Sequence, residues 1–443
     1  MAALVVVGVD GLRTSGVAQT SGNAVNAASG EDALRARQSA LFDQLLAEPD
    51  NLDLMFDYAL VSIQARDYEA AISTLERMLI YRQDLPRVRL ELAVAYFNLG
   101  SYEVAKLYFE QVLANEATPE TVQIRVDRYL DEIEDRSRRN DVRMIATAGI
   151  TYATNATLGP DANQVLFLGN LETLSSGQQE ADTGLRVTLN LAHAYDLGQA
   201  NNDTWRTELG YYGVQYFDTD QGDLNFLRVR TGPKLSLDPR TFGPKLRPYG
   251  EAQYLTSQNR GLFAAFGGGV EFSDTLSPTV SVYSDVGVRF TNYFRGEFTD
   301  EDVFTYYAAS GLAYLPRRDL ILRSTLIFEL DHAPGGQQNS NQEMGLRLSG
   351  EYSYDPGLNW VDGRWTASAY LEARGRLFER PDKEIDPGTT RHDIDLRGGL
   401  RHVFMIGDGF GLQVDVDGLW RQSNLRNFDV NNLSGTFSLR YEL

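Results

Sequence analysis

The chain has 443 residues, no cysteine and a formal net charge of −20. This length allows more than one domain with a sizeable core, and the absence of cysteine excludes a disulfide framework and a thiolate metal site. The acidic balance argues against a nucleic-acid partner, because phosphate binding needs a basic face.

Residues 1–30 are interpreted as a possible signal segment and flexible leader. Leu4 to Val9 form a short apolar run, but no basic residue precedes it and Asp10 ends it early. A secretory signal usually has a positive start and a longer apolar core. An incorrect start site and a processed chain therefore both stay open. Residues 19–31 are rich in Ser, Gly, Asn and Ala and are expected to be flexible.

An internal repeat follows the leader. Ala59, Tyr68, Ala71, Leu75 and Leu79 recur 34 residues later as Ala93, Tyr102, Ala105, Phe109 and Leu113. This is the period of tetratricopeptide repeats, in which each unit is an antiparallel pair of helices. A partial unit precedes the repeat at Glu31 to Ala47, and Pro119 to Arg139 is expected to form a capping helix. The sequence therefore predicts an all-α repeat domain over residues 31–141.

The first helix of each pair is expected to line a concave groove that binds an extended peptide. The candidate client-binding residues on these helices are Phe56, Gln64, Arg87, Phe97 and Asn98. The alternative is that apolar residues of the same face, such as Leu60, Leu90 and Val94, belong only to the core.

Residues 142–443 are dominated by short segments in which apolar and polar residues alternate. In the last one, Leu433, Phe437 and Leu443 share one face while polar residues occupy the other. About fourteen such segments, most of them about 11 to 16 residues long, are typical of an antiparallel transmembrane β-barrel. They begin near residues 143, 184, 204, 223, 246, 261, 278, 302, 319, 341, 363, 390, 409 and 430.

The connections and the aromatic residues favour a membrane barrel over a soluble sandwich. Asp274 to Ser277 and Met405 to Asp408 are short connections, whereas Asn292 to Glu301 and Glu379 to Gly388 are longer. Outer-membrane barrels have short periplasmic turns and longer outer loops. Aromatic residues also gather near strand ends, where they suit a headgroup boundary. The connection from Gly159 to Asp182 could fold inward as a plug or lie outside.

By alternation, the polar face of the barrel contains charges of both signs. The candidate lumen-lining residues are Arg323, Arg347, Arg364, Arg374, Asp415 and Asp417. One interpretation is a structural ladder of ion pairs between strands. The other is a polar conduit or plug to which a passing polypeptide does not adhere.

Catalytic signals are weak. The chain has four histidines, and His392 and Asp393 point to opposite faces of a strand. Asp393 and Asp395 share a face and could bind a cation or share a proton. No serine lies in a nucleophile-elbow context. We therefore expect no enzyme activity, catalytic residue, metal site or cofactor.

About two tetratricopeptide repeats directly before a barrel of about fourteen strands resemble the Slam family, the surface lipoprotein assembly modulators of Gram-negative bacteria. The resemblance covers the chain from about residue 31 to Leu443 and rests on architecture and the repeat. It implies a monomeric barrel in outer-membrane lipid, a helical domain in the periplasm, a client lipoprotein or secreted protein, and cooperation with the barrel-assembly machinery. The chain ends with Tyr441 in register and Leu443 last, which departs from the usual terminal aromatic residue.

The resulting hypothesis is an outer-membrane translocation factor that helps client proteins reach the cell surface. The alternative is a porin-like or polysaccharide-export channel with a periplasmic protein-interaction domain. Exporters of that kind usually carry many more repeats, which favours the first hypothesis.

Overall fold

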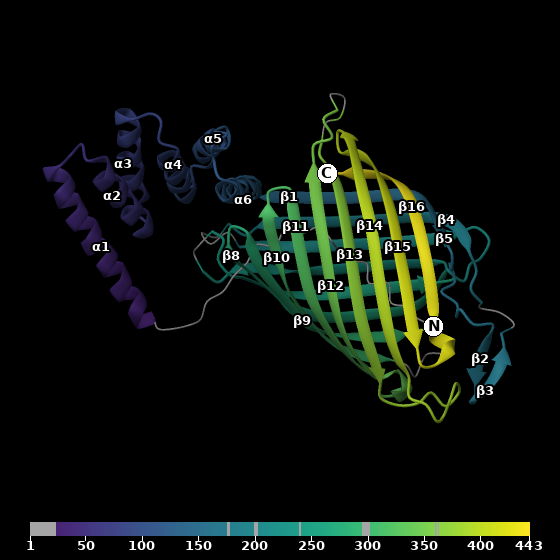
Figure 1. The fold of residues 1–443 in the computed structure, drawn as a ribbon. Helices are drawn as coiled ribbons and strands as arrows, with labels where there is room; N and C mark the ends of the chain where they lie inside the picture. The colour runs from purple at the N-terminus through teal and green to yellow at the C-terminus, as the bar shows by residue number, and fades with distance from the viewer. Residues whose placement is uncertain are drawn as a thin grey trace. The chain divides into compact units, whose positions relative to one another are not determined.

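The computed structural model describes residues 24–174, 178–198, 203–238, 241–294, 302–358, 361 and 363–443. The chain forms two compact units, a helical unit that ends at Arg139 and a barrel unit that begins at Asn140 (Figure 1). Most of the leader predicted for residues 1–30 lies outside the described residues, and the first helix begins at Ala24. None of the six described helices combines the length and the hydropathy that a membrane-spanning helix needs.

The helical unit consists of two antiparallel helix pairs, the second and third helices and the fourth and fifth, flanked by one helix on each side. Its helices are α1 (Ala24–Ala47), α2 (Leu52–Gln64), α3 (Tyr68–Tyr81), α4 (Pro86–Asn98), α5 (Tyr102–Leu113) and α6 (Glu120–Ser137). Side chains of Asn51 and Asp67 cap α2 and α3 by accepting hydrogen bonds from the amides of Leu54 and Ala70. The helices α4 and α6 begin instead at a proline-marked turn.

The repeat is visible in the packing and in the turns. Ala59, Ala71, Ala93 and Ala105 are fully buried, so the helices of each pair approach closely at these small residues. Arg66 and Gly100, which are 34 positions apart, both have positive φ angles, +62° and +85°. Each one follows the first helix of its pair, where a left-handed residue ends a helix.

The barrel confirms the predicted fold class. In the described part of the chain, fourteen antiparallel strands close in consecutive order, and the first strand pairs with the last. The strands are β1 (Asn140–Ala153), β4 (Asp182–Asp196), β5 (Thr204–Tyr216), β6 (Leu224–Ser236), β7 (Lys245–Ser257), β8 (Arg260–Ser277), β9 (Val280–Tyr293), β10 (Val303–Arg317), β11 (Leu320–His332), β12 (Asn341–Tyr354), β13 (Trp365–Phe378), β14 (His392–Gly407), β15 (Phe410–Ser423) and β16 (Val430–Glu442). Each begins within about three residues of the predicted start.

The two faces of the barrel differ as the alternation predicts. On β14, Ile394, Leu396 and Leu400 are exposed on the outer face, whereas Asp393 and Asp395 are buried on the inner one. The same pattern recurs around the sheet, with Leu326, Leu371 and Leu439 among the exposed outer residues. An outer face of this composition suits hydrocarbon, and an inner face of charges suits water.

The strand connections differ between the two ends of the barrel. Two-residue turns at 278–279, 318–319 and 408–409 lie at the end where β1 begins and β16 stops. Connections at the other end are mostly longer, including 294–302, 333–340 and 379–391, although the turn at 258–259 is short. The chain therefore joins the helical unit to the barrel at the end that carries most of the short turns.

The long connection after β1 contains a hairpin, β2 (Gln164–Phe167) and β3 (Asn170–Thr173). The amides of Leu168 and Gly169 donate to the carbonyls of Glu384 and Ile385 in the connection after β13. The Asn427 side chain bonds both backbone groups of Leu166. Figure 1 draws the hairpin beyond the strand ends at the lower right, so it lies outside the lumen instead of plugging it.

Candidate functional site

The first candidate site is the surface formed by α2 and α4, the first helices of the two pairs, together with the capping helix α6. The guanidinium carbon of Arg87 on α4 lies 4.8 Å from the ring centroid of Phe56 on α2. Arg87 is exposed and Phe56 is half-buried. This cation–π contact joins two predicted client-binding residues that are far apart in sequence.

A half-buried carboxyl extends the same surface toward α6. Glu91 lies one helical turn after Arg87. Burial raises the pKa of the Glu91 carboxyl above its ordinary value, although the positive charges of Arg125 on α6 and of Arg87 act in the opposite direction. We call Phe56, Arg87, Glu91 and Arg125 the groove surface. It presents an aromatic ring and charges of both signs, which are groups that an extended peptide can contact.

The prediction that Phe97 lies in the groove and binds a client is wrong. Phe97 is only 1% exposed, because its ring packs against the rings of Tyr102 and Tyr129 at centroid distances of 5.5 and 5.1 Å. The guanidinium of Arg136 covers it at 4.8 Å. The capping helix α6 thus encloses Phe97, which makes it a core residue instead of a client-binding one.

The remaining two predicted residues stand at helix ends. Gln64 is the last residue of α2 and is exposed. Asn98, the last residue of α4, is exposed, and its Nδ2 atom donates to the Val94 carbonyl at 2.8 Å. The structure therefore brings together Phe56 and Arg87. It places Gln64 and Asn98 at the ends of their helices, outside this contact.

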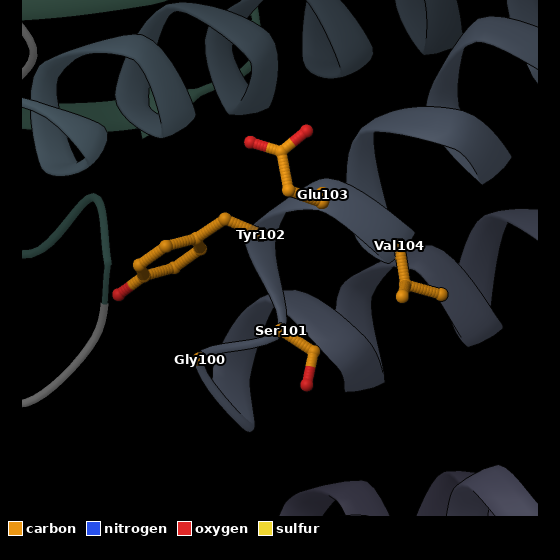
Figure 2. A pocket seen from close by; sticks show the side chains of 5 residues that line it. All are labelled: Gly100, Ser101, Tyr102, Glu103 and Val104. Atoms are coloured by element: carbon orange, nitrogen blue, oxygen red, sulfur yellow. The ribbon is translucent and has the colours of Figure 1, made fainter.

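A surface hollow of about 390 Å³ lies at the turn from α4 to α5 (Figure 2). Gly100, Ser101, Tyr102, Glu103 and Val104 line it. These five residues are consecutive, so the hollow does not bring together polar groups from separate elements. It has none of the convergence that a small-molecule site requires.

The second candidate site is the inner face of the barrel. Eight strands suffice to fill a barrel with side chains, while about sixteen leave an aqueous channel, so fourteen strands leave space for a lumen. Arg401 on this face retains 45% of its side-chain exposure, which shows that water reaches the interior beside it. The interior is therefore a polar surface with access to water at this point.

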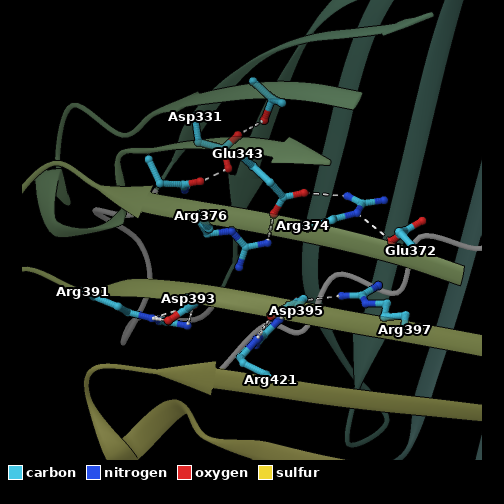
Figure 3. A network of polar contacts seen from close by, with 12 residues as sticks. Asp331, Glu343, Glu372, Arg374, Arg376, Arg391, Asp393, Asp395, Arg397 and Arg421 are labelled. Atoms are coloured by element: carbon cyan, nitrogen blue, oxygen red, sulfur yellow. Dashed lines mark hydrogen bonds and ion pairs between the residues drawn. The ribbon is translucent and has the colours of Figure 1, made fainter. Parts of the chain in front are cut away.

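The predicted lumen-lining residues that belong to strands lie on this face in ion pairs and hydrogen bonds, whereas Arg364 lies in the connection before β13. Arg323 lies 4.0 Å from Glu351, and Arg347 lies 3.5 Å from Glu372. Arg374 bonds both Glu343 and Glu372, at 2.6 and 2.7 Å (Figure 3). Arg364 precedes β13 and donates to the Ser353 carbonyl. A set of interstrand ion pairs, as expected for a structural ladder, is therefore present.

Asp415 and Asp417 belong to an arrangement that crosses the junction of the first and last strands. Arg186 on β4 bonds Asp415 on β15 at 2.5 Å. The strands β1 and β16 lie between these two. The intervening inner side chains are small, with Thr151 and Thr436 joined by a 2.8 Å hydrogen bond. The Arg186–Asp415 pair therefore bridges the seam at which the barrel closes.

Sequence reasoning missed several residues of the opposite wall. Arg247 and Glu271, which were not predicted for the lumen, form a 3.0 Å ion pair between β7 and β8. Arg230 joins the same group through Glu271, Glu251 and Asp285. Arg247 could have been predicted from its spacing, because it lies four residues before Glu251 on β7 and alternate residues of a strand share a face. A run of three glycines at 267–269 obscures the alternation on β8.

Glycines on the inner face make room for tyrosine side chains from neighbouring strands. A Cβ atom at Gly269 would lie 2.6 Å from the Tyr249 hydroxyl oxygen, and one at Gly311 would lie 2.6 Å from that of Tyr283. With this space, Tyr249 on β7 reaches Asp285 on β9 at 2.6 Å and Tyr307 on β10 at 2.5 Å. These contacts cross one or two intervening strands and fix their relative positions.

The acidic pair considered for catalysis is neutralised by arginines. Arg391 forks onto Asp393 with bonds of 2.6 to 3.0 Å, and Arg421 bonds both oxygens of Asp395 at 2.6 Å (Figure 3). Carboxylate oxygens that accept such bonds are engaged in ion pairs and not arranged around a cation.

Comparisons with known proteins give one family match and several distant structural similarities. A tetratricopeptide repeat family model matches residues 62–123. No match was found among curated proteins. Among solved structures, the outer membrane channel DcaP of Acinetobacter baumannii is 8% identical, with 69% of this chain and 97% of that chain covered and a TM-score of 0.36. A Pseudomonas aeruginosa FadL homologue is 10% identical, with 74% and 92% covered and a TM-score of 0.36. A loop-deletion mutant of OmpT, an outer membrane protein of Vibrio cholerae, is 10% identical, with 69% and 100% covered and a TM-score of 0.35.

Proposed function

We propose that this protein is an outer-membrane translocation factor that helps lipoproteins or related client proteins reach the cell surface. In this proposal the barrel spans the outer membrane, the helical unit stands in the periplasm, and the groove surface engages the client. The barrel-assembly machinery inserts the barrel, which acts as a monomer. The protein performs no catalysis.

The observation that carries the proposal is the union in one chain of a closed barrel with an apolar outer face and a repeat domain with an open groove surface. A repeat domain of this architecture provides a surface for a protein partner. Its direct attachment to β1 would deliver that partner to one end of the barrel. The Slam resemblance, which rests on the same union, supplies the client class.

The test compares cells that express the tagged full-length protein with cells that express variants of the groove surface. The Phe56→Ala/Arg87→Ala variant is expected to lose most of the bound client in a pull-down followed by mass spectrometry. It is also expected to reduce protease-accessible client on intact cells about tenfold, as loss of an anchoring pair does. The matched control is Lys106→Ala, an exposed charge on the other helix of a pair.

Either of two results would overturn the proposal. One is a set of bound proteins that does not change when residues 24–139 are deleted. The other is a client whose surface exposure is the same with and without the full chain.

A porin-like or polysaccharide-export channel is the second candidate, and the water-accessible charges of the inner face favour it specifically. Liposomes that contain the purified protein would then pass small solutes or oligosaccharides. Such flux, together with no client in the pull-down, would replace the translocation proposal by the channel.

A further inference from the structure

In the described part of the chain, β1 and β16 are the only neighbouring barrel strands that no connection joins. Every other neighbouring pair follows in chain order and is linked by a turn or a loop. The register pairs from Ile145 to Ala153 of β1, with backbone bonds at Met144 and Thr154 on either side, hold β1 and β16 together. We call this contact the seam. It depends on interactions between strands alone.

The inner side chains of the seam are small and uncharged over the register pairs from Gly149 to Ala153. Thr436 and Thr151 are joined there by a hydrogen bond of 2.8 Å. By contrast, β12 and β13 are also joined by an ion pair, Arg347 with Glu372. A hydrogen bond between neutral groups is weaker than one between charged groups. Side chains therefore hold the seam together less firmly than they hold β12 to β13.

A pair of longer side chains crosses the seam on the lumen side. Arg186 on β4 and Asp415 on β15 lie on either side of it and meet at 2.5 Å. Asp415 also accepts hydrogen bonds from Arg401 at 2.7 Å and from Gln413 at 2.8 Å, and both of these residues lie on its own side of the seam. The Arg186–Asp415 pair can therefore separate without leaving this buried carboxylate unpaired.

The two sides of the seam suit different parts of a lipoprotein. On its outer face Ile150 of β1 and Phe437 and Leu439 of β16 are exposed, and such a face meets hydrocarbon in a membrane. The lumen on the other side is lined by charges of both signs. Apolar surface is unfavourable in water, so acyl chains are favoured against the outer face, whereas a polar polypeptide is favoured in the lumen.

We infer that the seam opens toward the bilayer and is the passage for the acyl chains of a client lipoprotein, while the polypeptide of the client moves through the lumen. This inference rests on the proposed function, because it takes the lipid anchor of the client as the ligand. Separation of β1 from β16 connects the lumen with the bilayer without moving any connection between strands. The backbone groups that it frees face the water of the lumen, where unpaired backbone is tolerated at membrane depth.

The test closes the seam with a disulfide, in a full-length chain that has no cysteine of its own. Thr151→Cys/Thr436→Cys places two thiols on directly facing residues of antiparallel strands, which lie at a distance that a disulfide can span. Protease-accessible client on intact cells is measured for the lipoprotein that the pull-down recovers. Oxidation is expected to reduce this exposure about tenfold, and a reductant is expected to restore it.

Thr147→Cys/Thr188→Cys is the matched control. These two threonines join β1 to β4, and their hydroxyl oxygens lie 2.7 Å apart. A disulfide there also holds β1 but leaves the seam free, so client exposure is expected to stay unchanged. A second control is the same client with its lipidated cysteine replaced by alanine, whose passage is expected not to respond to the seam disulfide. If Thr151→Cys/Thr436→Cys does not fold, Ala153→Cys/Ser434→Cys, the next inner pair, replaces it.

The inference is overturned if the oxidised variant, with its free thiols lost, exposes the lipidated client as fully as the reduced one. It is equally overturned if the seam disulfide blocks the client without acyl chains as strongly, because the seam would then serve the polypeptide and not the anchor. A block by the control disulfide of equal size would overturn it too. If the reduced variant and the original protein expose no client, the proposed function fails, and the inference fails with it. The two kinds of failure are therefore distinguishable.

Discussion

At the residue scale, two positions in the helical unit show how one backbone conformation can be met by different residues. The equivalent turns of the two repeats contain Gly100 and Arg66, both with positive φ. Glycine adopts this conformation without steric cost, whereas a residue with a Cβ atom is strained by about 1 kcal/mol. The first repeat therefore carries strain that the second avoids.

Arg66→Gly is accordingly expected to stabilise the helical unit by about 1 kcal/mol, and Gly100→Ala to destabilise it by about 1 kcal/mol. No atom lies within 4 Å of a Cβ built at Gly100, so the cost there is conformational and not a clash. Thermal unfolding followed in the helical band of the circular dichroism spectrum measures both. Two variants that melt alike would contradict this account of the turns.

The Glu91 carboxyl gives the helical unit a pH dependence whose sign is set by its environment. Burial raises its pKa in the folded state above the value of about 4.3 expected in the unfolded chain. The folded state therefore holds this proton more tightly, and its contribution to stability falls as pH rises above about 4.

Glu91→Gln should remove that decline, so that the helical unit melts at a higher temperature than the original protein near neutral pH and at a similar one near pH 4. Thermal melts at the two pH values test this. A larger loss of stability at neutral pH in the variant would show instead that attraction to Arg87 and Arg125 outweighs burial.

At the element scale, one amide side chain attaches the β2–β3 hairpin to the barrel. Asn427 accepts from the Leu166 amide at 2.8 Å and donates to the Leu166 carbonyl at 2.9 Å, as a neighbouring strand would. Asn427→Ala removes both bonds, and a hydrogen bond contributes about 1 kcal/mol. We expect faster proteolysis within the hairpin and an unchanged melting temperature of the barrel. Unchanged cleavage would show that the bonds to Glu384 and Ile385 suffice.

The sequence predicted the secondary-structure elements more accurately than it predicted the contacts between side chains. Alternation placed all fourteen barrel strands, because each strand carries its membrane face in its own residues. Phe97 could not be placed, since its burial depends on α6, which packs from outside the repeat. The Arg186–Asp415 pair could not be foreseen either, because its members are 229 residues apart and meet only after the barrel closes. The local sequence pattern determines on which face of a strand a side chain lies. Its partners on distant strands are determined only when the barrel closes.

At the scale of the whole molecule, the barrel is complete within its own unit. Every strand pair of the closed sheet joins residues between Asn140 and Leu443. A chain of residues 140–443 is therefore expected to fold and to retain the heat-dependent mobility in gel electrophoresis that is typical of closed barrels. Loss of the mobility shift would mean that the helical unit is needed for barrel folding.

The pairing of β1 with β16 also governs how the barrel can be made. The nine register pairs from Ile145 to Ala153 connect the beginning of the barrel with its last residues. Such long-range contacts incur the largest loop-closure entropy and form slowly. Until the final strand is in place, the growing sheet has two unpaired edges that can pair with other chains. Loss of the whole of β16 would therefore leave two edges open, and we expect the truncated chain to aggregate instead of forming a smaller barrel.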